Sequence, residues 1–346
     1  MKQKITALLI MALLPACVLG YGARGHAMVG AIADLRLSID KPTQAKVAKL
    51  LDGISLAQAA TIADSIKSWD ICVEHTSMDV PVAGGARINA ELRAFVKANP
   101  CDSKPNHREF HYTDVPIAGD EKYSSGSIGR SDYDIVHMIA YCIKVLAGVE
   151  PEKNKRAITK SVAVILLAHY LGDIHQPLHV GAEYFDDNGD PVEPSQNIRW
   201  HGDQGGNKLD LFWYADGKPK ALGNLHSYWD TKVVDDAFED RGDNKIALEF
   251  AQNEPLGWRL TGDPDSLAQQ MADEILPIAR EAHRRLQYSK VRAKGNGDID
   301  GGRALDPQND DHTPYSVWSQ AIVKFEIQKA GWRLAAILSA ALADRR

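Results

Sequence analysis

Four residues that could bind a metal ion lie within eleven positions of one apolar stretch, residues 166–180. They are His169, Asp173, His175 and His179. His169 and Asp173 are four positions apart and share one face of a helix, where an imidazole and a carboxylate can hold a zinc ion. Pro177 ends that helix because it lacks an amide donor, which leaves His179 free to turn towards the same metal. For this pair alone, a core helix with a polar end is the simpler interpretation.

Ligand-type residues recur elsewhere in apolar or aromatic settings, which strengthens the metal interpretation. His226 and Asp230 repeat the spacing of the first pair. Further candidates are His26, Asp64, His111 and Asp114, with Lys67 one helical turn beyond Asp64. Nitrogen and oxygen ligands without cysteine favour zinc, and the set is too large for one tetrahedral ion. We therefore expect more than one zinc ion.

Helical periodicity dominates the rest of the chain. Its 346 residues are 44% hydrophobic, enough for one large domain or two small ones. Helices are predicted over residues 24–38, 43–52, 56–69, 132–148, 155–175, 225–238, 244–253, 265–288 and 315–343. No run of alternating residues indicates a substantial sheet, and residues 181–206 and 289–313 are typical of long surface loops. The pattern predicts a mainly α, compact multi-helix domain over residues 21–346.

Residues 1–20 are typical of a signal peptide. Lys2 and Lys4 precede an apolar run too short to span a bilayer comfortably, and small residues precede a predicted cleavage after Gly20. The mature chain would begin at Tyr21 and be exported to the periplasm or out of the cell. Lipidation at Cys17 is the alternative. No other hydrophobic stretch is long and exposed enough for a membrane span.

Charge and cysteine usage narrow the possible functions. The formal charge is −6, and loss of Lys2 and Lys4 makes it −8, from 38 basic and 46 acidic residues. Such a chain is a poor candidate for sequence-independent grip on a nucleic-acid backbone, although bound divalent metals would change the local charge. Cys72 and Cys101 flank a loop-rich stretch and could form a disulfide in an exported protein, whereas Cys142 is expected as a buried thiol.

Six motifs, in the same order, resemble those of the zinc-dependent single-strand-specific nucleases of the S-one/P-one type, within the zinc phospholipase C superfamily. They are GHxxVGxIA from Gly25, AD-x-x-K from Ala63, HYxDVP from His111, AHYLGDIHQPLHVG from Ala168, GGN from Gly205 and NLHxxWD from Asn224. The resemblance runs from Tyr21 to the C-terminal helix and leaves out the two long loops. It implies the helical fold of that family, with three zinc ions at the bottom of a cleft.

The resemblance also implies which residues bind zinc. The first ion would be held by Asp64, His111, His169 and Asp173. The second would share Asp173 and add His26 with the backbone amine and carbonyl of Tyr21. The third would take His179, His226 and Asp230. His175 has no ligand role in the family and points off the ligand-bearing helix face, so we expect it to be structural.

The activity that the resemblance implies is that of an endonuclease and 3′-nucleotidase. It would cleave single-stranded DNA and RNA and leave 5′-phosphates, with no stable protein partner. Asp64, Lys67 and Asp173 would be catalytic: the aspartates hold the ions that activate water, and Lys67 offsets charge on the phosphoryl oxygens. A surface lysine paired with a neighbouring acid is the alternative interpretation of Lys67.

Three further residues would grip the substrate. Tyr112 would stack on a base, while Asp114 and Asn207 would hydrogen-bond the edge of that base. If these residues bind the base and the metal ions bind the phosphate, substrate binding needs no basic surface patch. The acidic net charge is therefore compatible with a nucleic-acid substrate. A zinc phospholipase C on the same scaffold would not need these three residues. A non-catalytic periplasmic zinc-binding protein would leave them and Lys67 unexplained.

The chain departs from the family pattern at two places. Family members usually begin the mature chain with Trp, whereas Tyr21 stands here, which puts the packing of this side chain in question. Residues 181–203 are also inserted before the GGN element, at the expected mouth of the cleft. The insertion bears on substrate size and preference more than on the chemistry.

Overall fold

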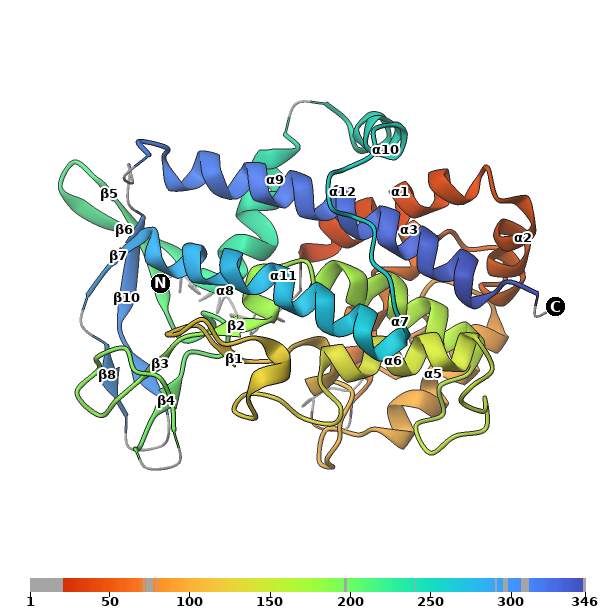
Figure 1. The fold of residues 1–346 in the computed structure, drawn as a ribbon, viewed down its shortest axis with the longest axis horizontal. Coiled ribbons are helices and arrows are strands. Elements are labelled where there is room, and N and C mark those ends of the chain that lie inside the picture. Colours follow the sequence, from red (N-terminus) through yellow and green to blue (C-terminus); the bar gives the residue numbers. More distant parts are fainter. Residues whose placement is uncertain are drawn as a thin grey trace, which may run out of the picture.

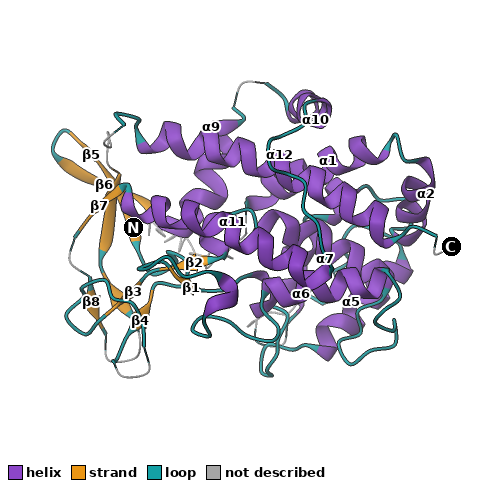
Figure 2. Ribbon diagram, in the orientation of Figure 1, coloured by secondary structure: helices purple, strands orange, loops and turns teal. Residues whose placement is uncertain are grey.

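The computed structural model describes residues 21–344, apart from 71, 73–76, 79, 196–197, 240, 290, 295–297 and 306–310. The predicted signal peptide, with Cys17, lies outside the described residues. Helices make up most of the described part, and short strands gather at one end of it (Figures 1 and 2). The prediction of a mainly α fold is confirmed.

The helices are α1 (Gly22–Leu37), α2 (Lys41–Leu50), α3 (Leu56–Ala59), α4 (Ile62–Ser65), α5 (Ala86–Ala98), α6 (Ile135–Leu146), α7 (Lys160–Asp173), α8 (Leu225–Ser227), α9 (Val233–Ala237), α10 (Asp243–Gln252), α11 (Pro264–Arg284) and α12 (Tyr315–Ala341). The strands are β1 (Val115–Pro116), β2 (Gly181–Ala182), β3 (Tyr184–Phe185), β4 (His201–Gly202), β5 (Asp210–Ala215), β6 (Lys218–Asn224), β7 (Leu286–Tyr288), β8 (Arg292–Ala293), β9 (Ile299–Asp300) and β10 (Gly302–Leu305).

Helix α7 is the central element of the fold. All of its residues after Lys160 are buried, as its apolar sequence predicts, and it packs against α1, α5, α6 and α12. Thr159 begins the helix by accepting a hydrogen bond from the N–H of Val162. After the helix ends, Pro177 begins a separate 3-10 turn, Pro177–His179. The predicted stop before this proline is therefore confirmed.

Glycines of the N-terminal motif allow neighbouring helices to approach α1 closely. A Cβ at Gly30 would lie 2.3 Å from the carbonyl oxygen of Leu56, so no side chain fits where α3 begins. Asp34, one turn further along α1, accepts hydrogen bonds from the N–H groups of Leu56 and Ala57. On the other side, Gly331 lets α12 lie against α1 in the same way. One apolar cluster joins these helices to α5, α6, α7 and α11.

Several predicted helices differ from those of the structure. The helix predicted over 56–69 is broken into α3, α4 and the 3-10 turn Ile66–Trp69. The helix predicted over 225–238 is interrupted by a π turn, Tyr228–Lys232. Helix α5 was not predicted, although Ile88, Leu92 and Phe95 place apolar residues at helical spacing along its buried face.

The expectation that the chain lacks a substantial sheet is wrong. Strands β6, β5, β10 and β7 form one four-stranded sheet, in that order. Strand β10 runs parallel to β5 and antiparallel to β7, and β5 runs antiparallel to β6. The helix predicted over 265–288 ends at Arg284, and the chain continues as β7. Strands β1 and β2 pair in parallel, and β3 pairs antiparallel with β4. No helix of the described part is both long and apolar enough to cross a bilayer.

Candidate metal centre

The predicted histidine and aspartate ligands come from separate elements and meet in the interior. His26 lies on α1, Asp64 on α4, His111 on the 3-10 turn Glu109–His111, His169 and Asp173 on α7, His179 on the turn after α7, His226 on α8 and Asp230 on the π turn. All of them are buried. Their ligand atoms gather in three groups, each within 4.8 Å: His26 with Asp64 and His169; His111 with His169 and Asp173; and His179 with His226 and Asp230.

The first predicted ligand set is brought together around one oxygen of Asp173. Its Oδ2 atom lies 2.9 Å from His111 Nδ1 and 3.1 Å from His169 Nε2. Asp64 Oδ1 completes the set, 3.6 Å from His169 Nε2 and 3.9 Å from His111 Nδ1. The two imidazoles are themselves 3.0 Å apart between these nitrogens. The structure thus brings together the four side chains that the resemblance assigns to the first ion.

The second oxygen of Asp173 faces a different part of the cluster. Its Oδ1 atom lies 3.3 Å from His26 Nε2 and 3.7 Å from His179 Nδ1. The ring of His26 stacks on that of His169, with 3.8 Å between centroids. This stacking depends on Gly172, because a Cβ there would lie 2.6 Å from His26 Nδ1. The two carboxylate oxygens of Asp173 therefore have the arrangement that a ligand shared by two ions needs.

The third ligand set forms a separate group beside the turn after α7. His226 Nε2 lies 3.2 Å from His179 Nε2 and 3.4 Å from Asp230 Oδ2. Asp230 Oδ1 accepts a hydrogen bond from the side-chain amide of Gln176, 2.8 Å away. Gln176 is not among the residues predicted from the sequence. Its burial beside a ligand, three residues before His179, marks it as the residue that orients Asp230.

Backbone carbonyls fix the orientation of three histidines. The Nδ1 atoms of His169, His179 and His226 lie 2.7–2.8 Å from the carbonyl oxygens of Ala60, His111 and Gly205, respectively. A carbonyl oxygen can only accept, so each Nδ1 carries the proton and each neutral ring presents a lone pair at Nε2. The Nε2 atoms of His179 and His226 thus face each other at 3.2 Å with two lone pairs, which repel unless a cation lies between them.

Unpaired polar atoms in the cluster also fit a bound cation. Both ring nitrogens of His26, Asp173 Oδ1 and Asp230 Oδ2 are buried and make no hydrogen bond within the described part of the chain. Buried polar atoms without partners cost about 1–3 kcal/mol each, and a bound cation at this cluster would satisfy these atoms together. Nitrogen and oxygen donors of these types suit zinc.

Burial keeps several histidines neutral, the form in which they bind metals. It lowers the pKa of His111 to about 3, with a further contribution from the charge of Lys67. It also lowers the pKa of His226 to about 3, assisted by His179. The pKa of His26 is lowered as well, by burial and then by His169.

The pKa values of Asp230 and Asp64 are shifted in opposite directions. Burial, reinforced by the charge of Asp173, raises the pKa of Asp230 well above its ordinary value. Burial also opposes ionisation of Asp64, but Lys67 together with the neighbouring histidines outweighs it and holds the pKa of Asp64 below its ordinary value. The ammonium of Lys67 lies 2.6 Å from Asp64 Oδ1. The predicted catalytic lysine is therefore at the edge of the first ligand set.

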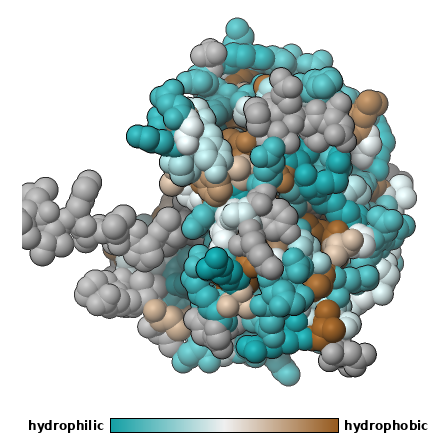
Figure 3. Space-filling model, turned by 90° about the vertical axis from the view of Figure 1, so that its left-hand side faces the viewer, coloured by the Kyte–Doolittle hydropathy of each residue, from teal (hydrophilic) through white to brown (hydrophobic). Residues whose placement is uncertain are grey.

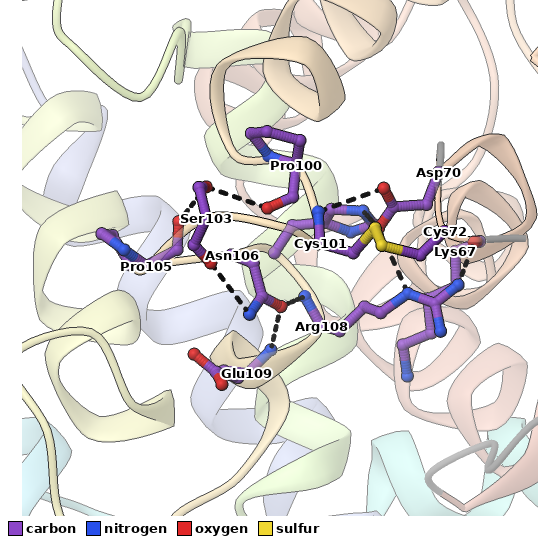
Figure 4. Close-up of a disulfide and its surroundings, with 11 residues drawn as sticks. Lys67, Asp70, Cys72, Pro100, Cys101, Ser103, Pro105, Asn106, Arg108 and Glu109 are labelled. Atoms are coloured by element: carbon purple, nitrogen blue, oxygen red, sulfur yellow. Dashed lines mark hydrogen bonds and ion pairs between the residues drawn. A yellow bond between two sulfur atoms is a disulfide. The ribbon is translucent and has the colours of Figure 1, made fainter.

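A disulfide and an ion-pair network join the segment of Lys67 to the segment of His111 (Figure 4). Cys72 and Cys101 are bonded, as predicted, and Cys142 is a buried free thiol. The buried carboxylate of Asp70 accepts hydrogen bonds from the Cys101 N–H and from Arg108. Arg108 also donates to the carbonyl oxygen of Lys67, at 2.8 Å. These contacts hold the segment with Lys67 against the segment that leads to His111, next to the first ligand set.

The three predicted substrate residues lie beside the cluster. Tyr112 directly follows His111, and 39% of its surface is exposed. Burial, and then the charge of Asp203, raise the pKa of Asp114 to about 7, while Lys208 opposes the shift. The Nδ2 group of Asn207 donates to Gln204, whereas its Oδ1 atom is buried and has no hydrogen-bond partner in the described residues. Tyr112 therefore presents an exposed ring, whereas Asn207 contributes a buried acceptor that has no partner in the described residues.

Tyr21 is fully buried next to the cluster. Gly22, which follows it, approaches the backbone of Asp230 so closely that a Cβ would lie 2.9 Å from the Asp230 carbonyl oxygen. His175 is buried outside the ligand groups; its Nδ1 lies 2.6 Å from the Leu171 carbonyl oxygen, and Arg333 donates to its Nε2 at 2.9 Å. His175 therefore connects the end of α7 to Arg333 of α12 through hydrogen bonds.

The insertion over residues 181–203 begins just after His179 and ends just before Gly205, both of which belong to the cluster or contact it. It begins as β2, which pairs with β1 directly after the His179 turn. It is closed by the pairing of β3 with β4, and the backbone of Asp203 then hydrogen-bonds that of Glu183. The chain re-enters the cluster at Gly205, whose carbonyl oxygen orients His226. The predicted surface loop thus contains a short antiparallel stem.

Comparison with known proteins agrees with this geometry. The model of the family described as S1/P1 Nuclease matches residues 21–343. The chain belongs to the S1/P1 nuclease family. Among curated relatives from Arabidopsis thaliana, Endonuclease 1 is 32% identical over 95 residues, which cover 28% of this chain and 24% of the relative. Endonuclease 5 is 30% identical over 99 residues, with coverages of 29% and 26%. Endonuclease 2 is 26% identical over 136 residues, 38% of each chain.

Membership of the S1/P1 nuclease family confirms the resemblance stated from the motifs. The matches to these three relatives span only 24–38% of the relatives' own length. The family model, by contrast, extends across all the ligand-bearing elements from α1 to the C-terminal helix α12. It therefore covers the entire histidine and aspartate cluster.

Proposed function

We propose that this protein is a zinc-dependent endonuclease and 3′-nucleotidase that hydrolyses single-stranded DNA and RNA to 5′-phosphate products. The observation that carries the proposal is the position of Asp173, whose two oxygens face two neighbouring ligand groups, while a third group lies beside them. We assign three zinc ions to these groups, with the ligand sets implied by the family motifs. The backbone amine and carbonyl of Tyr21 complete the second set.

Hydrogen bonds within the cluster orient its side chains for metal binding. Carbonyl-bound Nδ1 atoms present Nε2 lone pairs to the ions without further rearrangement. Gln176 holds Asp230 in place in the third set. Zinc bound at such ligands acts as a Lewis acid and makes water a nucleophile near neutral pH.

The residues around the cluster hold the substrate. The ammonium of Lys67 lies beside Asp64 and offsets negative charge on the phosphoryl oxygens. The half-exposed ring of Tyr112 stacks on a nucleobase, and Asp114 with Asn207 hydrogen-bonds the edge of that base. Because the base and the metal-bound phosphate carry the recognition, binding needs no extended basic surface, which suits the formal charge of −6.

We also propose export to the periplasm or the exterior, on the basis of the signal-peptide pattern in residues 1–20. The disulfide between Cys72 and Cys101 fits an oxidising compartment. Amino-terminal sequencing of the protein recovered from the host tests this assignment, with Tyr21 expected as the first residue.

The test of the activity combines substrates with metal analysis. Zinc-loaded protein is incubated with single-stranded DNA, RNA, a 3′-nucleotide and phosphatidylcholine, and product ends are identified. We expect cleavage of the first three with 5′-phosphate ends, and elemental analysis should give about three zinc ions per chain. Hydrolysis of phosphatidylcholine alone would indicate a phospholipase, and zinc binding without hydrolysis would indicate a storage protein.

A pair of variants tests the role of the cluster. Asp173→Asn should lower activity by more than about 100-fold, since loss of a group that merely supports a metal ligand costs about 10–100-fold. The control is His137→Gln, because His137 is a half-exposed histidine that pairs with Asp134 outside the cluster. If Asp173→Asn kept activity within a few-fold of the parent while binding the same amount of zinc, the bridging role would be wrong.

A further inference from the structure

An exposed indole lies next to the proposed base-binding residues. Trp200, in the insertion, is 38% exposed. Its ring packs edge-on against Tyr184 of β3, with 5.0 Å between centroids. The hydroxyl of Tyr184, a buried residue, donates to the carbonyl oxygen of Asp114 at 2.7 Å. A single side chain therefore connects Trp200 to the residue proposed to read the base.

The stem of the insertion fixes this position. Tyr184 pairs with Gly202, and its ring covers this glycine so closely that a Cβ there would lie 3.3 Å from the ring. The side chain of Tyr184 thus lies between Trp200, which its ring contacts, and the backbone of Asp114, which its hydroxyl contacts.

The surroundings of Trp200 favour nucleic acid over a protein partner. Its neighbour Arg199 is largely exposed, and its guanidinium lies 3.6 Å from one oxygen of Asp187. An aromatic ring beside an arginine is a common platform for single-stranded nucleic acid. Figure 3 looks at the end of the molecule that carries the strands. In its visible part the apolar residues form separate patches among hydrophilic ones, unlike a continuous protein-binding face.

We propose that Trp200 stacks on a base of the single-stranded substrate that neighbours the base held by Tyr112, Asp114 and Asn207. This inference rests on the proposed nuclease function and adds a second base position to it. The insertion, in which the chain departs from its family's motif spacing, would then extend the binding site from one base to two. Trp200 would be a specificity-determining residue that favours oligonucleotides over mononucleotides.

The test compares Trp200→Ala with Trp213→Ala in the zinc-loaded protein. Trp213 is a matched control because it is also a half-exposed indole, 43% exposed, but lies in the β5–β6 hairpin under Lys220. Each variant is assayed on a 3′-nucleotide and on a single-stranded tetranucleotide. For Trp200→Ala we expect KM for the tetranucleotide to rise about tenfold, within the range for a lost base stack, with a much smaller change for the 3′-nucleotide. Trp200→Phe should restore most of the loss.

Abasic substrates locate the second base. The loss caused by Trp200→Ala should disappear when one particular flanking position of the tetranucleotide lacks its base, because the indole then has no partner in either protein. Equal losses on both substrates would indicate damage to Asp114 through Tyr184 and overturn the proposal, as would an equal loss in Trp213→Ala or no change at all. An inactive parent protein on every nucleic-acid substrate would instead refute the proposed function itself.

Discussion

The hydroxyl of Tyr21 donates a hydrogen bond to the carbonyl oxygen of His175, 2.6 Å away. The imidazole of His175 in turn accepts from Arg333, which is paired with Glu274. This buried chain of contacts attaches the first described residue to the end of α7 and to α12. The side chain that replaces the family's usual Trp is therefore held by a specific polar contact, and the backbone of Tyr21 is oriented with it.

The Tyr21→Phe variant tests that contact. Removal of the hydroxyl leaves the buried carbonyl of His175 without this donor, so the free energy of unfolding should fall by about 1–3 kcal/mol. Because the ring and the proposed zinc-binding backbone remain, one zinc ion should be held more weakly but not excluded. Urea denaturation and zinc titration measure both effects. Tyr141→Phe, at a half-buried position on α6, is the control and should change neither.

An additional residue before Tyr21 should be far more damaging. A free α-amine has a reference pKa of about 7.7–8.0 and loses its proton readily to a metal, whereas an amide is a poor ligand. Protein that retains one Met ahead of Tyr21 should therefore lose one zinc ion and most activity, relative to protein that starts at Tyr21. Intact mass verifies the two amino termini. Equal zinc contents and equal rates would contradict the backbone-ligand assignment and favour lipidation at Cys17.

Loss of the disulfide should destabilise the protein. The bond closes a loop over a sequence separation of 29 residues, and loop-closure entropy for this length corresponds to about 3–4 kcal/mol. Cys72→Ser and the double variant with Cys101→Ser should lower the free energy of unfolding by similar amounts, as measured in urea. Cys142→Ala removes a thiol that forms no disulfide, so it serves as the control, with a smaller loss expected from core packing.

Asp114 should make stability depend on pH. Burial raises its pKa to about 7, against about 3.9 in an unfolded chain, so between these values the folded protein holds a proton that the unfolded chain releases. Its contribution to stability therefore falls as pH rises from about 4 to 7 and is constant above that range. Asp114→Asn removes this dependence, and all other titrating groups are shared by the two proteins.

Urea denaturation of zinc-free protein at pH 5 and pH 8 measures the difference. The Asn variant should be only modestly more stable than the parent at pH 5, where Asp114 is ionised in the unfolded chain but still protonated in the folded one. The gap should be wider at pH 8, where Asp114 is ionised in both. A stability difference that is the same at both pH values would show that Asp114 titrates in its ordinary range.

The central helix and its ligands could be predicted because their signals are local. Apolar residues all round α7 indicate burial, and the spacing of His169 and Asp173 places both on one face. The sheet could not be predicted in the same way. Strand β6 is largely exposed and has little apolar alternation, and β10 pairs with β5 across about ninety residues of sequence. Such pairing depends on the tertiary fold rather than on local pattern.

In the candidate site, too, features with a local sequence signal could be predicted, whereas features that depend on the tertiary fold could not. The family motifs predicted which histidines and aspartates gather in the three ligand groups. They gave no indication of Gln176 as the support of Asp230, because a single buried amide has no spacing signature. Nor could the sequence place Trp200 beside Asp114, since that contact requires the fold to bring Tyr184 to a residue 70 positions away.

The stem formed by β3 and β4 has a consequence for redesign and for evolution. It closes the insertion at its base, while the backbone contacts of Glu183 with Asp203 hold both ends at a fixed separation. Exchanges within residues 186–200 that keep Gly189, which lies directly against the backbone of Val291, should therefore be tolerated, because longer loops add little closure entropy once the ends are joined. Grafting such segments between homologues would vary substrate choice while the histidine and aspartate cluster keeps its geometry.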